Sequence, residues 1–170
     1  RHVFHESNDL IRNKVAAAVR SGITPVLCVG ETLVEREHYH TKQVISDQVC
    51  SGIANLTAEE VKKMVIAYEP VWALSNGTDF ANHKTPLPED VQKACEIIRA
   101  NIGELYGKEV AEKVKVLYGG SANKDNALSY LRTEGVDGLL PGGASLSLAT
   151  FWPIVEAASQ AVPMKIEVKA

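Results

Sequence analysis

Apolar positions at the start of this chain change from a helical spacing to a continuous short run. Within residues 6–22 apolar side chains recur at helical spacing, Ser7 is placed to cap the first turn, and Gly22 ends the pattern. Residues 23–29 then form a short apolar run that Gly30 breaks. Such a run is typical of a strand buried in a parallel sheet. The sequence therefore predicts a helix followed by a strand.

The same alternation of helix and strand continues along the rest of the chain. Strands joined by helices, rather than by tight turns, pair in parallel through right-handed crossovers. The sequence thus predicts one α/β domain over residues 1–170, with four parallel strands and about five flanking helices. The later predicted strands cover residues 63–67, 114–118 and 138–140, and the later predicted helices cover residues 31–52, 89–106, 123–131 and 145–158.

Composition narrows the expected partner to a small molecule. The 170 residues are 45% hydrophobic, which is enough to form a core, and the formal net charge is −3. There is no basic stripe of the kind that binds nucleic acid, and no apolar run approaches the ~18 residues of a membrane span.

The cysteines indicate reduced, structural thiols. Cys28, Cys50 and Cys95 are widely spaced, odd in number and without a Cys-x-x-Cys pair, which disfavours disulfides and zinc. We therefore predict a cytoplasmic protein without a metal site. The chain begins at Arg1 without a secretory leader, and we expect that residues upstream of it were removed.

Candidate chemistry collects where the predicted strands end. Gly30 and Glu31 follow the first predicted strand, and Glu69 follows the strand over residues 63–67. The glycine pairs 119–120 and 142–143 follow the next two strands, each before a predicted helix. The carboxyl ends of parallel strands lie on one face of a sheet, so these groups are expected to gather there. Bare backbone N–H groups and a helix start can receive an anion. From the residues alone two interpretations stay open: a phosphate site beside a carboxylate base, or tight turns beside a surface charge.

The residues after Glu69 resemble an anchored loop. Pro70 fixes the backbone angle at the exit from the strand, and Trp72 is a bulky anchor. The polar run over residues 75–79 is then expected to move as a lid over the site.

Four segments together resemble the triosephosphate isomerase family, in the same order and at the same spacing. The resemblance extends from residue 1 to about residue 158 and leaves the final residues without a clear counterpart. The four segments are residues 27–33 (LCVGETL), 67–73 (AYEPVWA), 118–121 (YGGS) and 137–145 (DGLLPGGAS).

The resemblance implies a partial (β/α)8 barrel from a glycolytic and gluconeogenic enzyme. That family interconverts dihydroxyacetone phosphate and glyceraldehyde 3-phosphate without a cofactor, and it uses a glutamate base under a closing loop. By motif, Glu69 is the base. The implied phosphate-binding positions are Ser75, Ser121, Gly142 and Gly143, and the implied lid and latch positions are Trp72, Gly77 and Tyr118, with Ser121 also contacting the closed lid.

This sequence departs from the family pattern in two places. Ser75 replaces a lid glycine, and extra residues follow through residue 83; a serine at positive φ is disfavoured, so lid closure is expected to differ. The family's electrophilic histidine, its asparagine and lysine after the first strand, and its dimer loop have no counterpart in residues 1–170. Losing one preorganised donor typically costs about 10²–10³-fold in rate, so we expect this chain alone to be nearly inactive. His2 and His5 are interpreted as helix-entry residues, and His38, His40 and His83 as solvated.

Four strands cannot close a barrel that needs about 250 residues and eight strands. The free edges and an inner layer of side chains would lack partners. We expect either a complementing N-terminal segment or a homo-oligomer to supply these partners. The homo-oligomer is preferred if the chain is a natural product of this length. The predicted inner layer consists of Val26, Cys28, Ile66, Leu117 and Leu139. Three functions remain open: an impaired isomerase, a non-catalytic phosphate-binding relative, and a structural half-barrel that assembles into an oligomer.

Overall fold

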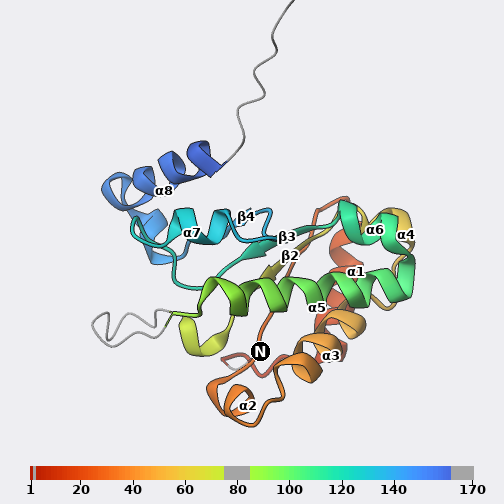
Figure 1. The fold of residues 1–170 in the computed structure, drawn as a ribbon. Helices are drawn as coiled ribbons and strands as arrows, with labels where there is room; N and C mark the ends of the chain where they lie inside the picture. Colours follow the sequence, from red (N-terminus) through yellow and green to blue (C-terminus); the bar gives the residue numbers. More distant parts are fainter. Residues whose placement is uncertain (2, 75–84, 162–170) are drawn as a thin grey trace, which may run out of the picture.

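Helices alternate with four parallel strands, as predicted (Figure 1). The computed structural model describes residue 1, residues 3–74 and residues 85–161. In chain order the elements are α1 (Asn8–Arg20), β1 (Val26–Val29), α2 (Leu33–Glu37), α3 (Thr41–Ile53), α4 (Ala58–Val61), β2 (Val65–Tyr68), the 3-10 turn η1 (Val71–Ala73), α5 (Pro88–Tyr106), α6 (Lys108–Lys113), β3 (Lys115–Tyr118), α7 (Ala127–Leu131), β4 (Gly138–Leu139), the 3-10 turn η2 (Gly143–Leu146) and α8 (Leu148–Ala161).

The four strands pair in sequence order, β1-β2-β3-β4, and end at one level. Val29, Tyr68, Tyr118 and Leu139 are register partners across the three pairings. The segments that follow the strands therefore start side by side, which is the geometry that an α/β site requires.

One face of the sheet is covered by helices (Figure 1) and forms the main core. Leu27, Ile66 and Val116 are register partners on this face and are buried in that core. The opposite face carries Cys28, which is exposed, and Val26, which is 47% exposed. Part of the chain's apolar surface is therefore left open.

The prediction of the inner layer was wrong for Ile66 and Leu139, which lie on the helix-covered face of the sheet. Side chains alternate across a strand, and Cys28 pairs with Ala67 rather than with Ile66. Ile66 consequently points into the main core, where Leu139 also packs. Val26, Cys28 and Leu117 do lie on the opposite face, as the register of the strands places them.

The predicted long helix over residues 31–52 is two helices, α2 and α3, which are separated at residues 38–40. Tyr39 has a left-handed backbone, with φ of 60°, and this conformation ends α2.

The short helices α4 and α6 were not predicted. A capping box of Thr57 and Glu60 starts α4, and its residues are a recognisable signal in the sequence. Ser7 caps α1 as predicted, by accepting a hydrogen bond from the Leu10 N–H.

Arg99 of α5 fixes the connection that leads into β4. Its guanidinium donates to the carbonyls of Ala111, Val114 and Gly135 and to the Asp137 carboxylate at 2.6 Å. The last strand is thereby held to the rest of the sheet.

None of the helices within the described residues is long and apolar enough to cross a bilayer.

His5 and Tyr39 have strained backbones, with φ of 52° and 60°, and both are exposed. Left-handed backbone costs a side-chain-bearing residue roughly 1–2 kcal/mol, and no packing of these exposed side chains offsets that cost. We expect His5→Gly to raise the free energy of unfolding by about 0.5–1 kcal/mol in urea titrations. Ser21→Gly, at an exposed position with φ of −89°, is the control and should give no gain. Equal effects of the two glycines would contradict the strain.

Candidate active site

Glu69 leaves the end of β2 between the ends of two neighbouring strands. Its N–H donates to the Val29 carbonyl at 2.7 Å, and the Gly119 N–H donates to the Tyr68 carbonyl at 2.8 Å. These hydrogen bonds extend the sheet by one residue beyond β2 and β3. The backbone of Glu69 is therefore fixed on both sides.

Two glycines make room for Glu69. A Cβ on Gly30 would lie 2.0 Å from the Glu69 carbonyl oxygen, and a Cβ on Gly119 would lie 2.6 Å from Glu69 Cγ. The first contact is with backbone, which cannot move aside, and the second is with the Glu69 side chain itself. Because Gly30 and Gly119 lack a Cβ, the chain segments after β1 and β3 can approach Glu69 this closely.

The Glu69 carboxyl group is half-buried. Burial raises its pKa above the ordinary glutamate value, and a contact with the Cys28 thiol partly offsets this rise. Although Cys28 as a whole residue is exposed, desolvation of its thiol and the neighbouring Glu69 carboxylate raise the pKa of Cys28 to about 12. A carboxylate whose pKa moves toward neutrality is suited to accept and return a proton.

A second carboxylate, Glu31, lies wholly buried next to the site. It accepts hydrogen bonds from the Tyr68 hydroxyl, at 3.1 Å and 3.2 Å to its two oxygens, and from the Trp72 indole N–H at 2.9 Å. Burial and the adjacent Glu31 carboxylate raise the pKa of Tyr68, so its hydroxyl stays protonated and donates. Glu31 therefore holds Trp72 by a charged hydrogen bond.

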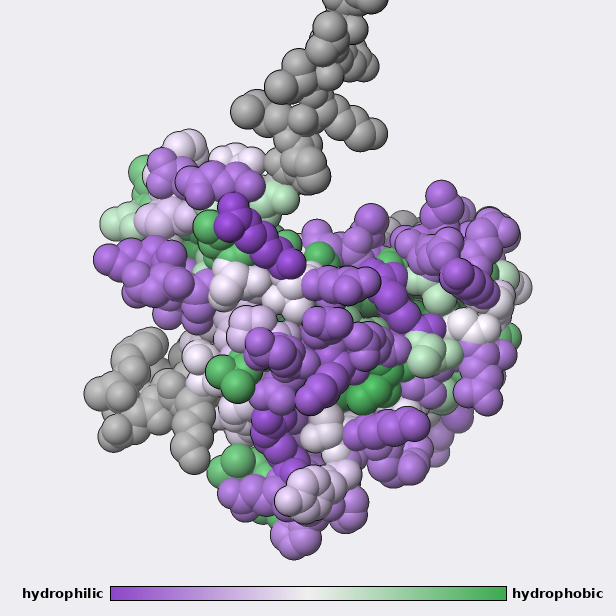
Figure 2. Space-filling model, in the orientation of Figure 1, coloured by the Kyte–Doolittle hydropathy of each residue, from purple (hydrophilic) through white to green (hydrophobic). Residues whose placement is uncertain are grey.

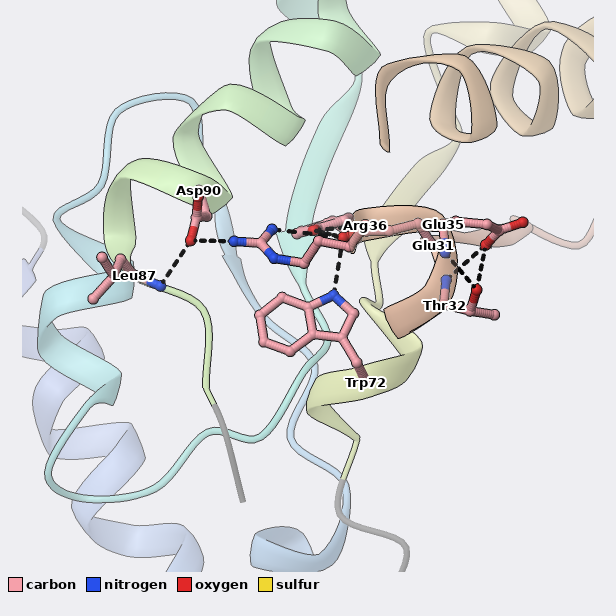
Figure 3. A network of polar contacts seen from close by, with 8 residues as sticks. Glu31, Thr32, Glu35, Arg36, Trp72, Leu87 and Asp90 are labelled. Atoms are coloured by element: carbon pink, nitrogen blue, oxygen red, sulfur yellow. Dashed lines mark hydrogen bonds and ion pairs between the residues drawn. The ribbon is translucent and has the colours of Figure 1, made fainter. Parts of the chain in front are cut away.

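Arg36 extends this network to α5 (Figure 3). Its guanidinium carbon lies 4.5 Å from the centre of the Trp72 ring, and it pairs with Glu31 at 3.8 Å and with Asp90 at 2.8 Å. A cation over an indole face is attractive, more so when water is excluded. The network joins α2, the turn after β2 and the start of α5. The sequence had placed Glu31 among the groups at the strand ends but had assigned it no role.

The network predicts unequal effects for the chain's two tryptophans. Trp72→Phe removes a hydrogen bond to a buried carboxylate and should lower the free energy of unfolding by about 1.5–3 kcal/mol. Trp152 is 53% exposed, so Trp152→Phe should change it by less than about 0.5 kcal/mol. Urea unfolding followed by circular dichroism compares the two variants. A larger loss for Trp152→Phe would contradict the network.

The predicted phosphate-binding residues differ in exposure and in the hydrogen bonds that they make. Gly142 and Gly143 are exposed, and a Cβ on either would meet nothing within 4 Å. The Ser121 N–H donates to the Ala73 carbonyl at 3.1 Å. Ser75 lies outside the described residues, as do Gly77, the rest of the predicted lid through residue 84, and the last nine residues.

Tyr118, the predicted latch, is fully buried. Its hydroxyl has no hydrogen-bond partner among the described residues, although its ring lies 4.2 Å from that of Tyr130. Tyr130 in turn donates to the Pro86 carbonyl at 2.7 Å. Ser121 and Tyr130 therefore contact the chain on the two sides of residues 75–84.

The described residues contain no cluster of three or more His, Cys, Asp or Glu side chains that could hold a metal ion. His5, His38 and His40 are exposed, and His2 and His83 lie outside the described residues. The exposure of His38 and His40 agrees with their interpretation as solvated side chains.

Comparison with known proteins decides the family. The model of the family described as triosephosphate isomerase matches residues 1–158. This chain belongs to the triosephosphate isomerase family. The resemblance seen in the four sequence segments is thereby confirmed.

Curated triosephosphate isomerases are similar over most of this chain. The protein of Protochlamydia amoebophila is 47% identical over 155 residues, which are 91% of this chain and 56% of that protein. Those of Carboxydothermus hydrogenoformans and Chlamydia felis are 44% and 45% identical and are covered over 60% and 58% of their lengths. The chain thus spans less than two thirds of the length of each of these relatives. The activity of the whole enzyme is therefore proposed, and not shown, for this chain.

Proposed function

We propose that this chain provides the catalytic base and part of the phosphate site of an isomerase that interconverts dihydroxyacetone phosphate and glyceraldehyde 3-phosphate. One observation carries the proposal: the Glu69 carboxyl is half-buried at the strand ends, with Gly119 left bare beside it and its pKa raised. A surface charge would have neither the fixed backbone nor the raised pKa.

In this reaction the Glu69 carboxylate removes a proton from C1 of dihydroxyacetone phosphate. The C–H electron pair forms the carbon–carbon double bond of an enediol, and the carbonyl oxygen at C2 takes up a proton. The Glu69 carboxylic acid then returns a proton to C2, the hydroxyl at C1 loses its proton, and an aldehyde forms there. No net proton, electron or cofactor is consumed, and positioned proton transfer contributes roughly 10²–10⁴-fold.

The substrate phosphate would be held by backbone N–H groups of Ser75, Ser121, Gly142 and Gly143. The exposure of Gly142 and Gly143 supports this part of the proposal, because a phosphate can approach them. The Ser121 N–H must first release the Ala73 carbonyl. Phosphate binding and a rearrangement of the chain after Trp72 would therefore be coupled.

Trp72 and Gly77 are proposed to carry the lid, and Tyr118 to latch it. The buried hydroxyl of Tyr118, without a partner among the described residues, supports a latch, because an unsatisfied buried hydroxyl gains from any acceptor that reaches it. Closure would remove water from Glu69 and raise its pKa further.

Activity is proposed only for a barrel whose remaining strands are supplied by another polypeptide segment or another copy of the chain. The family's electrophilic histidine and its lysine have no counterpart in residues 1–170. A different polypeptide segment could bring them, whereas another copy of the chain would close the sheet without them and should be nearly inactive. Such a protein would work in the cytoplasm on a phosphorylated triose.

An isomerase assay tests this proposal. We define the completed barrel as this chain joined to the part of the Protochlamydia amoebophila protein that the match leaves out. The completed barrel should turn over dihydroxyacetone phosphate, while the 170-residue chain alone should be slower by at least about 10²–10³-fold. Equal turnover would contradict the need for completion. Binding of the substrate by calorimetry without any turnover in the completed barrel would instead favour a non-catalytic phosphate-binding protein.

A further inference from the structure

Gln48 reaches the end of β1 from the neighbouring helix α3. Its side chain is hydrogen-bonded to both backbone groups of Gly30. The Gly30 N–H donates to Gln48 Oε1 at 2.8 Å, and Gln48 Nε2 donates to the Gly30 carbonyl at 3.2 Å. One carboxamide thus fixes the peptide groups on both sides of the Gly30 Cα.

Gln48 is a polar residue on the apolar side of its helix. That side of α3 also holds Ile45, Val49 and Ile53, which are fully buried, whereas the surface over α3 and α5 is mostly hydrophilic (Figure 2). Gln48 itself is only 9% exposed, and a buried amide is costly unless it is hydrogen-bonded. Because the helix is packed into the core on both sides of Gln48, its carboxamide holds Gly30 from a fixed position.

Gly30 is tied in turn to the backbone of Glu69. The Val29 carbonyl accepts from the Glu69 N–H at 2.7 Å, and the Glu31 carbonyl accepts from the Val71 N–H at 2.9 Å. Between these two hydrogen bonds Gly30 lies so close to Glu69 that a Cβ on it would be 2.0 Å from the Glu69 carbonyl oxygen. A shift of Gly30 would therefore also shift the backbone that carries the Glu69 carboxyl group.

The position of a proton-transferring group is critical for its rate. A misplacement of about 1 Å can cost about 10²-fold, and hydrogen bonds from a packed helix can hold a reacting group that closely. Gln48 makes no hydrogen bond to Glu69 among the described residues, so its effect on Glu69 passes through Gly30.

We propose that Gln48 is a positioning residue for the isomerisation: by holding both backbone groups of Gly30, it sets where Glu69 stands relative to the substrate. The inference rests on the proposed function, in which Glu69 is the base. Gln48 acts through Gly30 and is not itself a catalytic residue.

Gln48→Leu in the completed barrel tests the proposal. Leucine removes both hydrogen bonds to Gly30, so kcat should fall by about 10–10²-fold while KM changes by less than about threefold. Tyr106→Phe is the matched control, because the Tyr106 hydroxyl donates to the carbonyls of Ile53 and Leu56, at and just after the end of α3, at 2.6 Å and 3.1 Å. It too removes contacts to two backbone groups, and it should lower the melting temperature while kcat stays unchanged.

The titration of Glu69 gives a readout that needs no turnover. Burial raises the pKa of Glu69, so a displaced and better solvated carboxyl should titrate at lower pH. Following its carboxyl carbon by NMR in the substrate-free completed barrel should show this shift in Gln48→Leu and not in Tyr106→Phe.

Gln48→Glu serves as a second variant if Gln48→Leu fails to fold. A carboxylate at this position can accept from the Gly30 N–H but cannot donate to the Gly30 carbonyl, whereas the protonated carboxyl group can do both. The ratio of its kcat to that of wild type should therefore be low at neutral pH and rise as the pH falls.

Unchanged kcat in folded Gln48→Leu, an equal loss in Tyr106→Phe, or an unshifted Glu69 titration in Gln48→Leu would overturn the proposal. A Gln48→Glu ratio that does not vary with pH would overturn it as well. If the completed barrel turns over no substrate while the titration of Glu69 still shifts only in Gln48→Leu, only the proposed function is contradicted.

Discussion

Replacing Glu69 by Gln should lower the turnover of the completed barrel by about 10²–10⁴-fold with little change in substrate affinity. Glutamine keeps the size and polarity of the side chain but cannot accept the proton from C1. Steady-state assays in both directions of the isomerisation measure the effect. A variant that loses affinity while keeping its kcat would show that Glu69 binds substrate without moving a proton.

The stability of the Glu69→Gln variant gives an independent check of the environment of this residue. Burial raises the pKa of Glu69 in the folded chain, so the folded state binds a proton that the unfolded state has already released. Its contribution to stability is fully present below the unfolded pKa, near about 4.3, and is lost as the pH rises through the raised folded pKa. Glu69→Gln should therefore be more stable than wild type at neutral pH and similar at low pH.

Glu60 provides a control of opposite sign. Hydrogen bonds from the Thr57 backbone and side chain lower the pKa of Glu60, so its contribution is present above the unfolded pKa and is lost as the pH falls. Glu60→Gln should therefore be less stable than wild type at neutral pH only. The same direction of change for both variants would contradict a buried Glu69.

Replacing Gly30 by Ala should destabilise the chain by about 3 kcal/mol or more, because the new methyl group meets backbone that cannot move aside. A Cβ at Gly30 would lie 2.0 Å from the Glu69 carbonyl oxygen and 2.9 Å from the Pro70 nitrogen. Urea unfolding measures the loss, and the assay of the completed barrel should show reduced turnover as Glu69 is displaced.

Gly103→Ala is the matched control for this glycine. Gly103 lies within α5, and a Cβ there would lie 3.8 Å from the Ala111 Cβ, an ordinary van der Waals contact, so alanine should not lower the free energy of unfolding. If Gly103→Ala proved as destabilising as Gly30→Ala, close approach of the strand ends would not be what requires Gly30.

The fold class followed from the sequence because helix and strand differ in the spacing of apolar residues, and that spacing is strong in residues 6–29. Strand register was less accessible. Ile66 was assigned to the wrong face because its neighbour Ala67, not Ile66, pairs with Cys28. The break between α2 and α3 depends on the backbone angle of Tyr39, which the pattern of polar residues does not reveal.

The site was predictable only in part. The gathering of Glu69 and Gly119 follows from parallel strands that end together. The burial of Glu31 under Tyr68 and Trp72 does not, because a glutamate after a strand is usually solvated, and only the packing shows three donors converging on it. The neighbourhood of Cys28 and Glu69 likewise depends on the register between β1 and β2.

The most direct test is to convert dihydroxyacetone phosphate with the completed barrel in D2O and examine the product by proton NMR. Proton transfer through Glu69 predicts deuterium from the solvent at C2 of glyceraldehyde 3-phosphate in the fraction of turnovers in which the carboxylic acid exchanges its proton before returning one. Conversion at an unchanged rate, with unchanged deuterium at C2, in the Glu69→Gln variant would contradict it.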